Sequence, residues 1–426
     1  MNLFITNSTN NRSLLIILLI FIINYLLYFK VNFKFNSPRG LLLHNKIQKL
    51  FENFINFGDK FDVYLQIHNS IIEKSENETK KITFAIPAKG YGYGNKVYGL
   101  ISALVIAIIT DSAVLIDWPE AEKFIESPLK DTFKKFNTTF QLSLGYTGNT
   151  SNYHQHALSQ NDWIYEKRLE YLVNKSIPND KIRYIYADIR PMWFTLCSNP
   201  IYYKKFESYD LVQTSTLERA KEALDSTSTM SEEEKIHRLY MIGFEVGSNL
   251  FNKVWVINQK FMNEINEIYD ENFKNNFVIG MQLRYDYLSD NDISKFIQCA
   301  KYIQEINEKK KNVKWFITTE HAKILKMLDD EYGHMVIQGK GKIGILSYDP
   351  NTYSRSIIDN ELLGRVDEMI ITGGSTYGFT SALRNQKLPY YIEGRRRNMD
   401  DNNTLVPCKR MNFARAPRTP LNYSVV

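Results

Sequence analysis

The sequence predicts an α/β protein in which two Rossmann-like domains face a cleft, preceded by a single transmembrane helix. Three observations predict this class. They are an apolar run near the N-terminus, β-rich runs that alternate with helical ones over most of the chain, and a long helical region at residues 216–269 that divides this alternation in two. Strands that alternate with helices form parallel sheets covered on both faces. At 426 residues the chain is also long enough for two domains of ordinary size.

Composition and charge exclude several classes of protein. Apolar residues make up 44% of the chain, which excludes a disordered protein. The formal net charge of +6 is modest and no dense basic stripe is visible, so we expect no nucleic-acid partner. The cysteines, Cys197, Cys299 and Cys408, lack CxxC spacing. This excludes a zinc ribbon and a disulfide-framework fold but leaves room for one disulfide.

The apolar run SLLIILLIFIINYLLYF, at residues 13–29, is just long enough to span a membrane. The segment that follows it offers no small-x-small cleavage site, so we expect an uncleaved signal anchor rather than a removed signal peptide. Residues 1–12 then form a short tail, and residues 30–80 a stem with a lead-in helix. Basic residues lie mainly after the span, and by the positive-inside rule this argues against a lumenal C-terminal domain. Charge alone therefore does not determine on which side of the membrane the C-terminal domain lies.

The expected strands follow one another in a regular order. In the first half they are KITFAIPA, SAVLIDW and KIRYIYAD, and in the second half NFVIGMQLR, VKWFITT, HMVIQ, DEMIITG and LPYYIEG. Each run is short, rich in β-branched or aromatic residues, and bounded by polar or glycine-containing segments. We therefore place an N-terminal Rossmann-like domain at residues 81–250 and a C-terminal one, with the tail, at residues 251–426.

The stretch YGYGNKVYGLISALVIAIITDSAVLIDWP, at residues 91–119, fits a nucleotide-binding loop, a second membrane span or a buried helix. Its glycines do not follow the G-x-G-x-x-G spacing of a dinucleotide-binding loop. A membrane span is disfavoured because Lys96 lies near its start and Asp111 and Asp117 interrupt its end. We therefore expect one β-α-β unit, with a tight glycine turn, a buried helix at Tyr98 to Ile109 and a strand at Ala113 to Trp118.

The glycine turn of this unit is a candidate binding loop. Gly92 and Gly94 would let the backbone approach a ligand closely. Asn95 and Lys96 would present polar groups at the N-terminus of the helix.

Four blocks, in the same order, resemble the plant xyloglucan fucosyltransferase family. GYGNKVYGLISALVIAIITDSAVLID is similar to the Gly-x-Gly-Asn-Arg segment of that family, and FNKVWVINQKF to its Asn-x-Val-Trp helix. IGMQLRYD resembles its Ile-Gly-Ile-Gln-Val-Arg strand, and DEMIITGGSTYGFTSALRNQKLPYYI resembles its Thr-Ser-x-x-Ser-Thr-Phe-Gly-Tyr block. The later PCKR resembles a Pro-Cys of the family. Together the blocks cover much of residues 81–410.

The resemblance implies a GT-B-like pair of domains, with the acceptor on the N-terminal domain and the GDP-sugar on the C-terminal domain. It implies an inverting alpha-1,2-fucosyltransferase that moves fucose from GDP-fucose to a hydroxyl of a glycan, which we expect to belong to a galactose residue. No metal or other cofactor is expected. With the anchor at residues 13–29, it further implies a single-pass type II protein of the Golgi membrane with a lumenal catalytic domain. The acceptor stays unspecified, because residues 120–175 align with nothing in the family.

Without a metal, protein cations and helix dipoles must stabilise the departing diphosphate. Arg284, at the end of the strand VIGMQLR, has this role in the resemblance, and its guanidinium offers bidentate donors to phosphate. The alternative is an arginine that pairs with Asp286 or another acid.

The block TGGSTYG also follows a strand and opens a helix, so its backbone N–H groups could bind an anion. Ordinary helix capping by Ser375 or Thr376 is the competing explanation. The candidate donor-binding residues of this block are Gly373, Gly374, Ser375, Thr376 and Tyr377, although the Gly-Gly pair stands where the family often has an aromatic residue.

An inverting transferase also needs a carboxylate to accept the proton of the acceptor hydroxyl. Asp188 ends the strand KIRYIYAD and aligns with an aspartate of the family, although Ile189 and Arg190 replace its Asn-Tyr. We predict Asp188 as this base. Asp117 is the second choice because it too ends a strand of the first domain, but capping of a turn is the favoured explanation there.

Two other functions stay open. A catalytically silent relative would bind glycan or nucleotide without turnover. A transferase for another nucleotide sugar could use a metal held by Asp290 and Asp292 of the DND segment, although helix capping explains these acids better.

Overall fold

The computed structural model describes residues 60–74, 80–87, 92–133, 182–187, 193–284, 288, 290–307, 312–344, 350–392 and 408–413. They belong to one compact unit that begins at Lys60. The predicted anchor at residues 13–29 and the predicted base Asp188 lie outside the described residues.

The first sheet has three parallel strands in the order β2-β1-β3. They are β1 (Ile82–Pro87), β2 (Ala113–Ile116) and β3 (Ile182–Ala187). All three were predicted from the sequence. The helix α3 (Phe61–Glu73) lies in the stretch interpreted as stem and lead-in helix, and it packs against β2. His68 of α3 is fully buried and accepts a hydrogen bond from the backbone N–H of Val114 at 3.2 Å.

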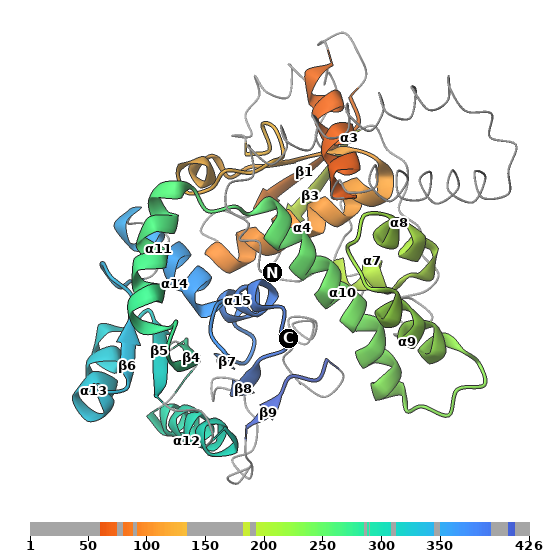
Figure 1. Ribbon diagram of the computed structural model, residues 1–426. Coiled ribbons are helices and arrows are strands. Elements are labelled where there is room, and N and C mark those ends of the chain that lie inside the picture. Colours follow the sequence, from red (N-terminus) through yellow and green to blue (C-terminus); the bar gives the residue numbers. More distant parts are fainter. Residues whose placement is uncertain are drawn as a thin grey trace, which may run out of the picture. The chain divides into compact units, whose positions relative to one another are not determined.

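The helix α4 (Tyr93–Thr110) connects β1 to β2 and lies against both the first sheet and α15 (Thr376–Asn385) (Figure 1). It is the one helix among the described residues that is long and apolar enough to cross a membrane. Because 15 of its 18 residues are buried inside the protein, it is a core helix, as predicted. Its start was predicted wrongly, since the helix begins at Tyr93 and not at Tyr98. The residues that were expected to form a glycine turn instead form the N-cap and the first turn of α4.

The second sheet has six strands in the order β6-β5-β4-β7-β8-β9. The strands β4 (Phe277–Leu283), β5 (Val313–Thr319), β6 (Val336–Gln338), β7 (Glu368–Thr372) and β8 (Tyr390–Ile392) are parallel, and β9 (Lys409–Arg410) is antiparallel to β8. The five parallel strands are those predicted from the sequence. The chain starts in the middle of the sheet at β4, runs outward to β6, and then crosses back to β7. This is doubly wound topology with a switch point between β4 and β7.

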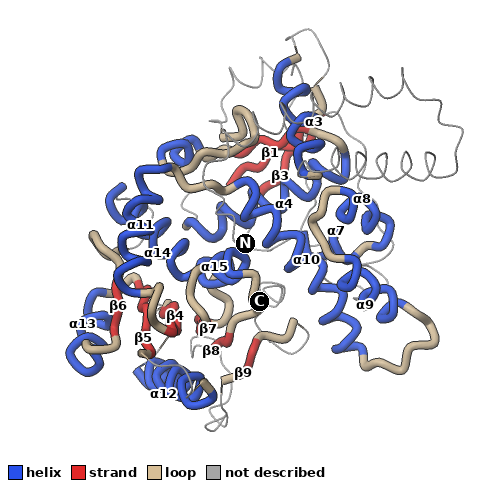
Figure 2. Tube along the Cα trace, in the orientation of Figure 1, coloured by secondary structure: helices blue, strands red, loops and turns tan. Residues whose placement is uncertain are grey.

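Helices cover both faces of the second sheet (Figure 2). On one face, α12 (Asp290–Ile306) and α13 (Ala322–Tyr332) pack against the side chains of Ile279 and Met281. On the other, α14 (Pro350–Leu363) and α15 pack in the cluster that contains Val278. Successive residues of β4 thus face opposite layers, and all seven are buried, which explains why the strand reads as a continuous apolar run.

The helical region predicted at residues 216–269 is three helices. They are α9 (Thr214–Leu224), α10 (Glu232–Val254) and α11 (Gln259–Asn272), and the short α7 (Trp193–Ser198) and α8 (Tyr203–Ser208) precede them. Ser231 caps α10 by accepting a hydrogen bond from the N–H of Glu234 at 3.2 Å. The predicted boundary at residues 250/251 falls inside α10, and one hydrophobic cluster contains residues of both sheets. The division into two domains stays a prediction.

The segment 408–413 joins the outer edge of the second sheet to the helices. Cys408 forms a disulfide with Cys299 of α12, which is the single bridge that the sequence left room for, and Cys197 is a buried free thiol. The backbone N–H of Met411 donates to the carbonyl oxygen of Pro389 at 2.8 Å. Phe413 is 2% exposed and its ring lies 5.2 Å from that of Phe194 on α7.

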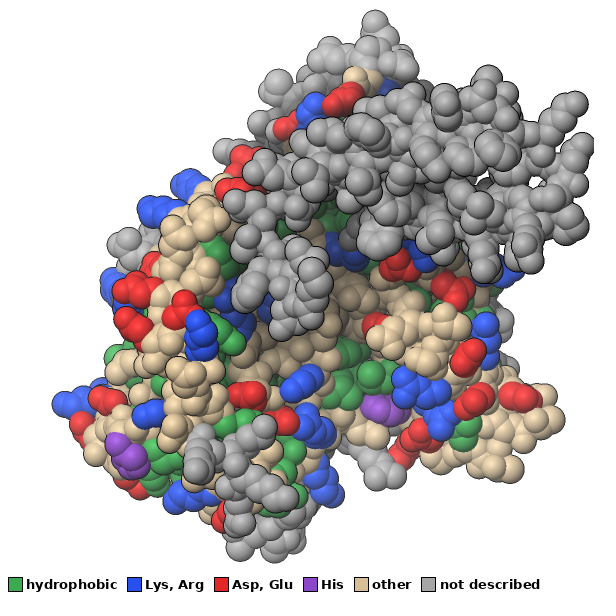
Figure 3. Space-filling model, in the orientation of Figure 1, with side chains coloured by type: hydrophobic (Ala, Val, Ile, Leu, Met, Phe, Trp, Pro, Cys, Tyr) green, Lys and Arg blue, Asp and Glu red, His purple; other side chains and the backbone are tan. Residues whose placement is uncertain are grey.

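Charged side chains of both signs are mixed over the described surface shown in Figure 3. On that face, acidic and basic side chains of the described residues lie among one another and not in patches of one sign.

Candidate functional site

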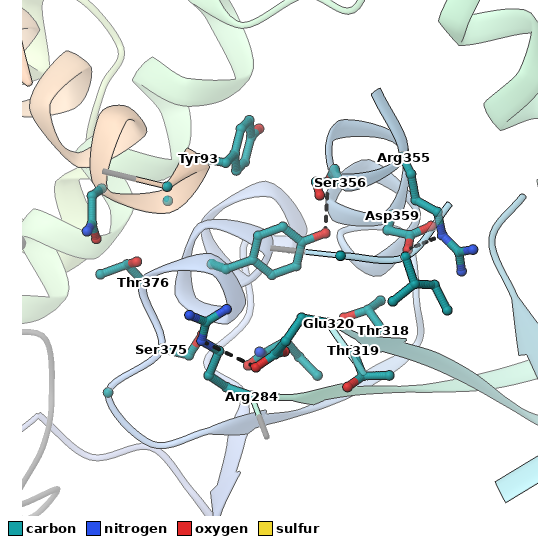
Figure 4. A pocket seen from close by; sticks show the side chains of 18 of the residues that line it. Tyr93, Arg284, Thr318, Thr319, Glu320, Arg355, Ser356, Asp359, Ser375 and Thr376 are labelled. Carbon is teal, nitrogen blue, oxygen red and sulfur yellow. Dashed lines mark hydrogen bonds and ion pairs between the residues drawn. The ribbon is translucent and has the colours of Figure 1, made fainter. Parts of the chain in front are cut away.

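A cavity of about 230 Å³ lies at the carboxyl ends of β4, β5 and β7, at the switch point of the second sheet. Open α/β sheets bind their ligands at this place. The start of α4, the helix that connects β1 to β2, forms another part of the wall (Figure 4). The lining residues are Gly92, Tyr93, Gly94, Asn95, Gln282, Arg284, Thr318, Thr319, Glu320, Lys342, Ile343, Gly344, Arg355, Ser356, Asp359, Gly374, Ser375, Thr376 and Tyr377.

Three hydrogen bonds hold β4 and β7 together where they end. The hydroxyl of Thr372 donates to the carbonyl oxygen of Gln282 at 2.9 Å, and Gln282 Oε1 accepts from the backbone N–H of Thr372 at 3.2 Å. The backbone N–H of Arg284 donates to Thr372 Oγ1 at 2.9 Å. Thr372 and Gln282 are buried. These bonds fix the point at which Arg284 leaves its strand.

The side chain of Arg284 reaches the cavity beside an acid. Its Nε lies 3.5 Å from Glu320 Oε1, and the side chains are 31% and 7% exposed, respectively. Figure 4 shows the two side chains directed toward each other, and Ser375 lines the same cavity. Glu320 is therefore one acid beside Arg284, whereas Asp286, the acid named from the sequence, lies outside the described residues. The signal of Glu320 in the sequence is its place directly after the strand VKWFITT, at the same sheet edge as Arg284.

The segment between β7 and α15 combines a capping role with exposure to the cavity. Ser375 is the N-cap of α15 and accepts a hydrogen bond from the N–H of Gly378 at 3.3 Å, so the capping explanation is correct. Gly374 adopts a φ of +76°, which favours glycine, and it lines the cavity. Gly373 does not line it, and its N–H donates to the carbonyl oxygen of Ile392 at 2.7 Å. Thr376 and Tyr377 complete the wall on this side.

The tyrosines of the cavity wall are held as neutral phenols. Tyr377 donates its hydroxyl to the carbonyl oxygen of Ser356 at 2.8 Å, and burial raises its pKa well above the usual value. Burial also raises the pKa of Tyr93, whose ring packs edge-on against Tyr377 at 6.0 Å between centroids. Neither phenol is therefore available as a general base near neutral pH.

The first turn of α4 brings three of its four predicted residues to the cavity. Gly92, Gly94 and Asn95 line it, and Asn95 Oδ1 is buried without a hydrogen-bond partner among the described residues. Lys96 does not line it, and its Nζ lies 5.3 Å from the centre of the Trp118 ring. Burial lowers the pKa of Lys96, against the effects of Glu120 and Asp117.

Gly94 was predicted to allow close approach of a ligand, but its neighbour is protein. A Cβ at this position would lie 2.6 Å from the carbonyl carbon of Thr376 and 2.6 Å from the backbone nitrogen of Tyr377. The glycine therefore lets the first turns of α4 and α15 touch, and this contact shapes the wall.

A buried ion pair on α14, which has no signal in any motif, forms another part of the wall. Arg355 Nε lies 3.0 Å from Asp359 Oδ2, and Arg355 Nη1 donates to the carbonyl oxygen of Gly341 at 2.7 Å. Asp359 Oδ1 and the hydroxyl of Thr318 are buried without hydrogen-bond partners among the described residues. Two acceptor oxygens are thus available to a ligand with N–H groups. The four-residue spacing of Arg355 and Asp359 on one helix is the only signal of the pair in the sequence.

The charge state of Asp359 makes stability depend on pH. Burial raises its pKa to about 6, although Arg355 opposes this shift. Because the folded protein then binds a proton more tightly than the unfolded chain does, Asp359 disfavours folding increasingly as pH rises from about 4 to about 6. The unfolding free energy of the wild type, minus that of Asp359→Asn, should fall by on the order of 2 kcal/mol over this range and then stay constant. Urea denaturation at several pH values measures it, and a flat difference would show that Asp359 titrates normally.

The other predicted acids lie elsewhere. Asp117 follows β2, donates its backbone N–H to the carbonyl oxygen of Ala85 at 2.9 Å and does not line the cavity. Asp290 is the first residue of α12, and Asp292 is buried 3.1 Å from Lys295 Nζ. Within the described residues no group of three or more His, Cys, Asp and Glu side chains could hold a metal ion.

Comparison with known proteins places this fold among solved structures. No protein-family model matches the chain, and no curated protein matches it in sequence. An arginine-to-lysine mutant of the xyloglucan fucosyltransferase FUT1 from Arabidopsis thaliana, in complex with GDP, aligns with a TM-score of 0.53 and 11% identity, covering 82% of this chain and 81% of that one. The fucosyltransferase NodZ from Bradyrhizobium aligns with a TM-score of 0.42 and 17% identity, covering 74% of this chain and 96% of that one. The match to FUT1 shows that the chain has the GT-B-like fold of a fucosyltransferase, as the sequence resemblance predicted.

Proposed function

We propose that the protein is a glycosyltransferase that moves fucose from GDP-fucose to a hydroxyl of a glycan, with inversion and without a metal. The observation that carries this proposal is the cavity at the switch point, in which Arg284 lies beside the N-terminal turn of α15. The fold of FUT1 and the four sequence blocks support the choice of donor. We further propose a single-pass type II protein of the Golgi membrane, anchored by residues 13–29.

The chemistry of the departing diphosphate assigns the roles on the donor side. When the acceptor oxygen bonds to the anomeric carbon of fucose, the bond from that carbon to the diphosphate oxygen breaks and negative charge grows on the leaving group. The Arg284 guanidinium and the N–H groups at the start of α15 stabilise this charge because they are fixed before the reaction. Gly374 has no side chain to obstruct the approach of the diphosphate to this turn.

The polar wall on α14 and β5 suits the base of the nucleotide. Asp359 Oδ1 and Thr318 Oγ1 can accept hydrogen bonds from N–H groups such as those of guanine. A ligand that meets these buried acceptors removes the unfavourable free energy of leaving them without partners.

The acceptor side belongs to the N-terminal sheet. Asp188, directly after β3, remains the proposed base that accepts the proton of the acceptor hydroxyl, with Asp117 as the second choice. We propose a galactose residue of a glycan as the acceptor. A catalytically silent relative and a transferase for another nucleotide sugar are the outcomes that the following experiment distinguishes.

Calorimetric titration of GDP into the full-length protein in EDTA tests the donor site. Arg284→Ala should weaken binding by about 1.5–3 kcal/mol, the scale of a lost hydrogen bond to a charged group. Arg365→Ala is the matched control, since Arg365 is similarly exposed and pairs with Glu361 but lies outside the cavity. It should leave GDP affinity unchanged.

Two results would overturn the proposal. One is that the wild type does not bind GDP, and the other is that binding requires manganese and is insensitive to Arg284. If GDP binds as expected, transfer from GDP-fucose to galactose-terminated oligosaccharides distinguishes an active enzyme from a silent relative.

A further inference from the structure

Glu320 is an acid in the wall of a cavity that we assign to an anion. Its side chain is 7% exposed, and its Oε1 lies 3.5 Å from Arg284 Nε. Both residues line the cavity, Arg284 after β4 and Glu320 after the neighbouring β5. A carboxylate here repels a diphosphate, so its presence requires a compensating role.

We propose that Glu320 is a positioning residue that holds the guanidinium of Arg284 in its binding orientation; this inference rests on the proposed function. A guanidinium is planar, so a partner at Nε fixes the plane in which the other two nitrogens lie. The backbone of Arg284 is fixed by Thr372, as described above, and Glu320 fixes the other end of the side chain. Ordering before binding reduces the side-chain entropy that a ligand must otherwise remove.

Arg355, the other arginine of the cavity wall, is oriented in a different way from Arg284. Arg355 pairs with Asp359 one turn away on its own helix and also donates to the carbonyl oxygen of Gly341, so its orientation is set locally. Arg284 follows a strand, and its acid comes from the next strand, 36 residues later in the sequence. The orientation of Arg284 thus depends on the register of β4 and β5.

A double-mutant cycle with GDP, measured by calorimetry on the full-length protein in EDTA, tests this role. Glu320→Ala should weaken GDP binding roughly 5- to 30-fold, the scale of one lost charge-assisted contact. In an Arg284→Ala background the same change should not weaken binding further. Glu320→Gln should stay within about threefold of the wild type, because the amide oxygen can accept a hydrogen bond from Nε–H.

Glu361→Gln is the matched control. Glu361 is 9% exposed and pairs with Arg365 and Arg384, but it does not line the cavity. Its neutralisation should lower the thermal midpoint without changing GDP affinity. This separates a general effect of removing a buried carboxylate from an effect on Arg284.

A second measurement does not need the nucleotide. In protein labelled with ¹⁵N-arginine, the Nε–H of Arg284, assigned with Arg284→Ala, should exchange slowly with solvent in the wild type and Glu320→Gln, and quickly in Glu320→Ala. If GDP fails to bind but this difference is seen, the proposed function fails while the positioning of Arg284 stands. Additive effects in the cycle, tighter GDP binding by Glu320→Ala, or unchanged exchange would each overturn the inference.

Discussion

Gly94→Ala is expected to lower the unfolding free energy by about 3 kcal/mol and to weaken nucleotide binding. The added methyl group would lie 2.6 Å from the carbonyl carbon of Thr376 and 2.6 Å from the backbone nitrogen of Tyr377. These are backbone atoms, so no side chain can rotate to make room, and α4 must move away from α15. Since both helices line the cavity, this movement changes the binding wall as well as the core.

Urea denaturation and GDP titration of the same preparation measure the two effects. Gly92→Ala is the matched control, because Gly92 lies two residues away and its φ of −71° suits any residue. Its unfolding free energy should stay within about 1 kcal/mol of the wild type. A similarly small change for Gly94→Ala would show that the helix contact is looser than described.

Removal of the disulfide, by serine at both Cys299 and Cys408, is expected to lower the unfolding free energy by about 2–4 kcal/mol. The bridge joins residues 109 positions apart, and long closed loops restrict the unfolded chain most. The backbone N–H groups of Met411 and Phe413, which bond to Pro389 O and His237 Nδ1, should also exchange faster with solvent.

Chemical denaturation with and without reductant measures the effect of the bridge. The wild type should lose stability in reductant, whereas the double-serine variant should not respond. Cys197→Ala serves as a control, since burial raises the pKa of this thiol and keeps it protonated. A wild-type midpoint that is insensitive to reductant would contradict the prediction.

The five parallel strands of the second sheet could be predicted from the sequence because each is a short apolar run with polar or glycine-containing ends. The start of α4 could not be predicted in this way. Gly92, Gly94 and Asn95 are typical of a turn when their neighbours in sequence are considered alone. They lie at the start of a helix because α15, which comes almost 300 residues later, packs against Gly94. A tertiary contact thus determines where α4 begins, whereas local propensity predicts a turn there.

The candidate site likewise contains residues that could be predicted from the sequence and residues that could not. Arg284 and the α15 turn follow their strands directly, so their place at the sheet edge could be read from the sequence. Glu320 and Asp359 were not predicted as site residues, and Lys96, which was, lies over the ring of Trp118 and not in the cavity. The disulfide partners could not be chosen either, because three cysteines allow three pairings and only the fold brings Cys299 and Cys408 together.

The segment 408–413 also determines when the fold can be completed during synthesis. It follows every other described element in the chain, yet Arg410 pairs with Glu368 at 2.7 Å, and Phe413 packs against Phe194, 219 residues earlier. On the ribosome, the outer edge of the second sheet and the aromatic pocket on α7 and α10 stay uncovered until this segment emerges. Domains usually fold as they are made. This protein instead completes part of its core with a segment that follows all of its other described elements in the chain.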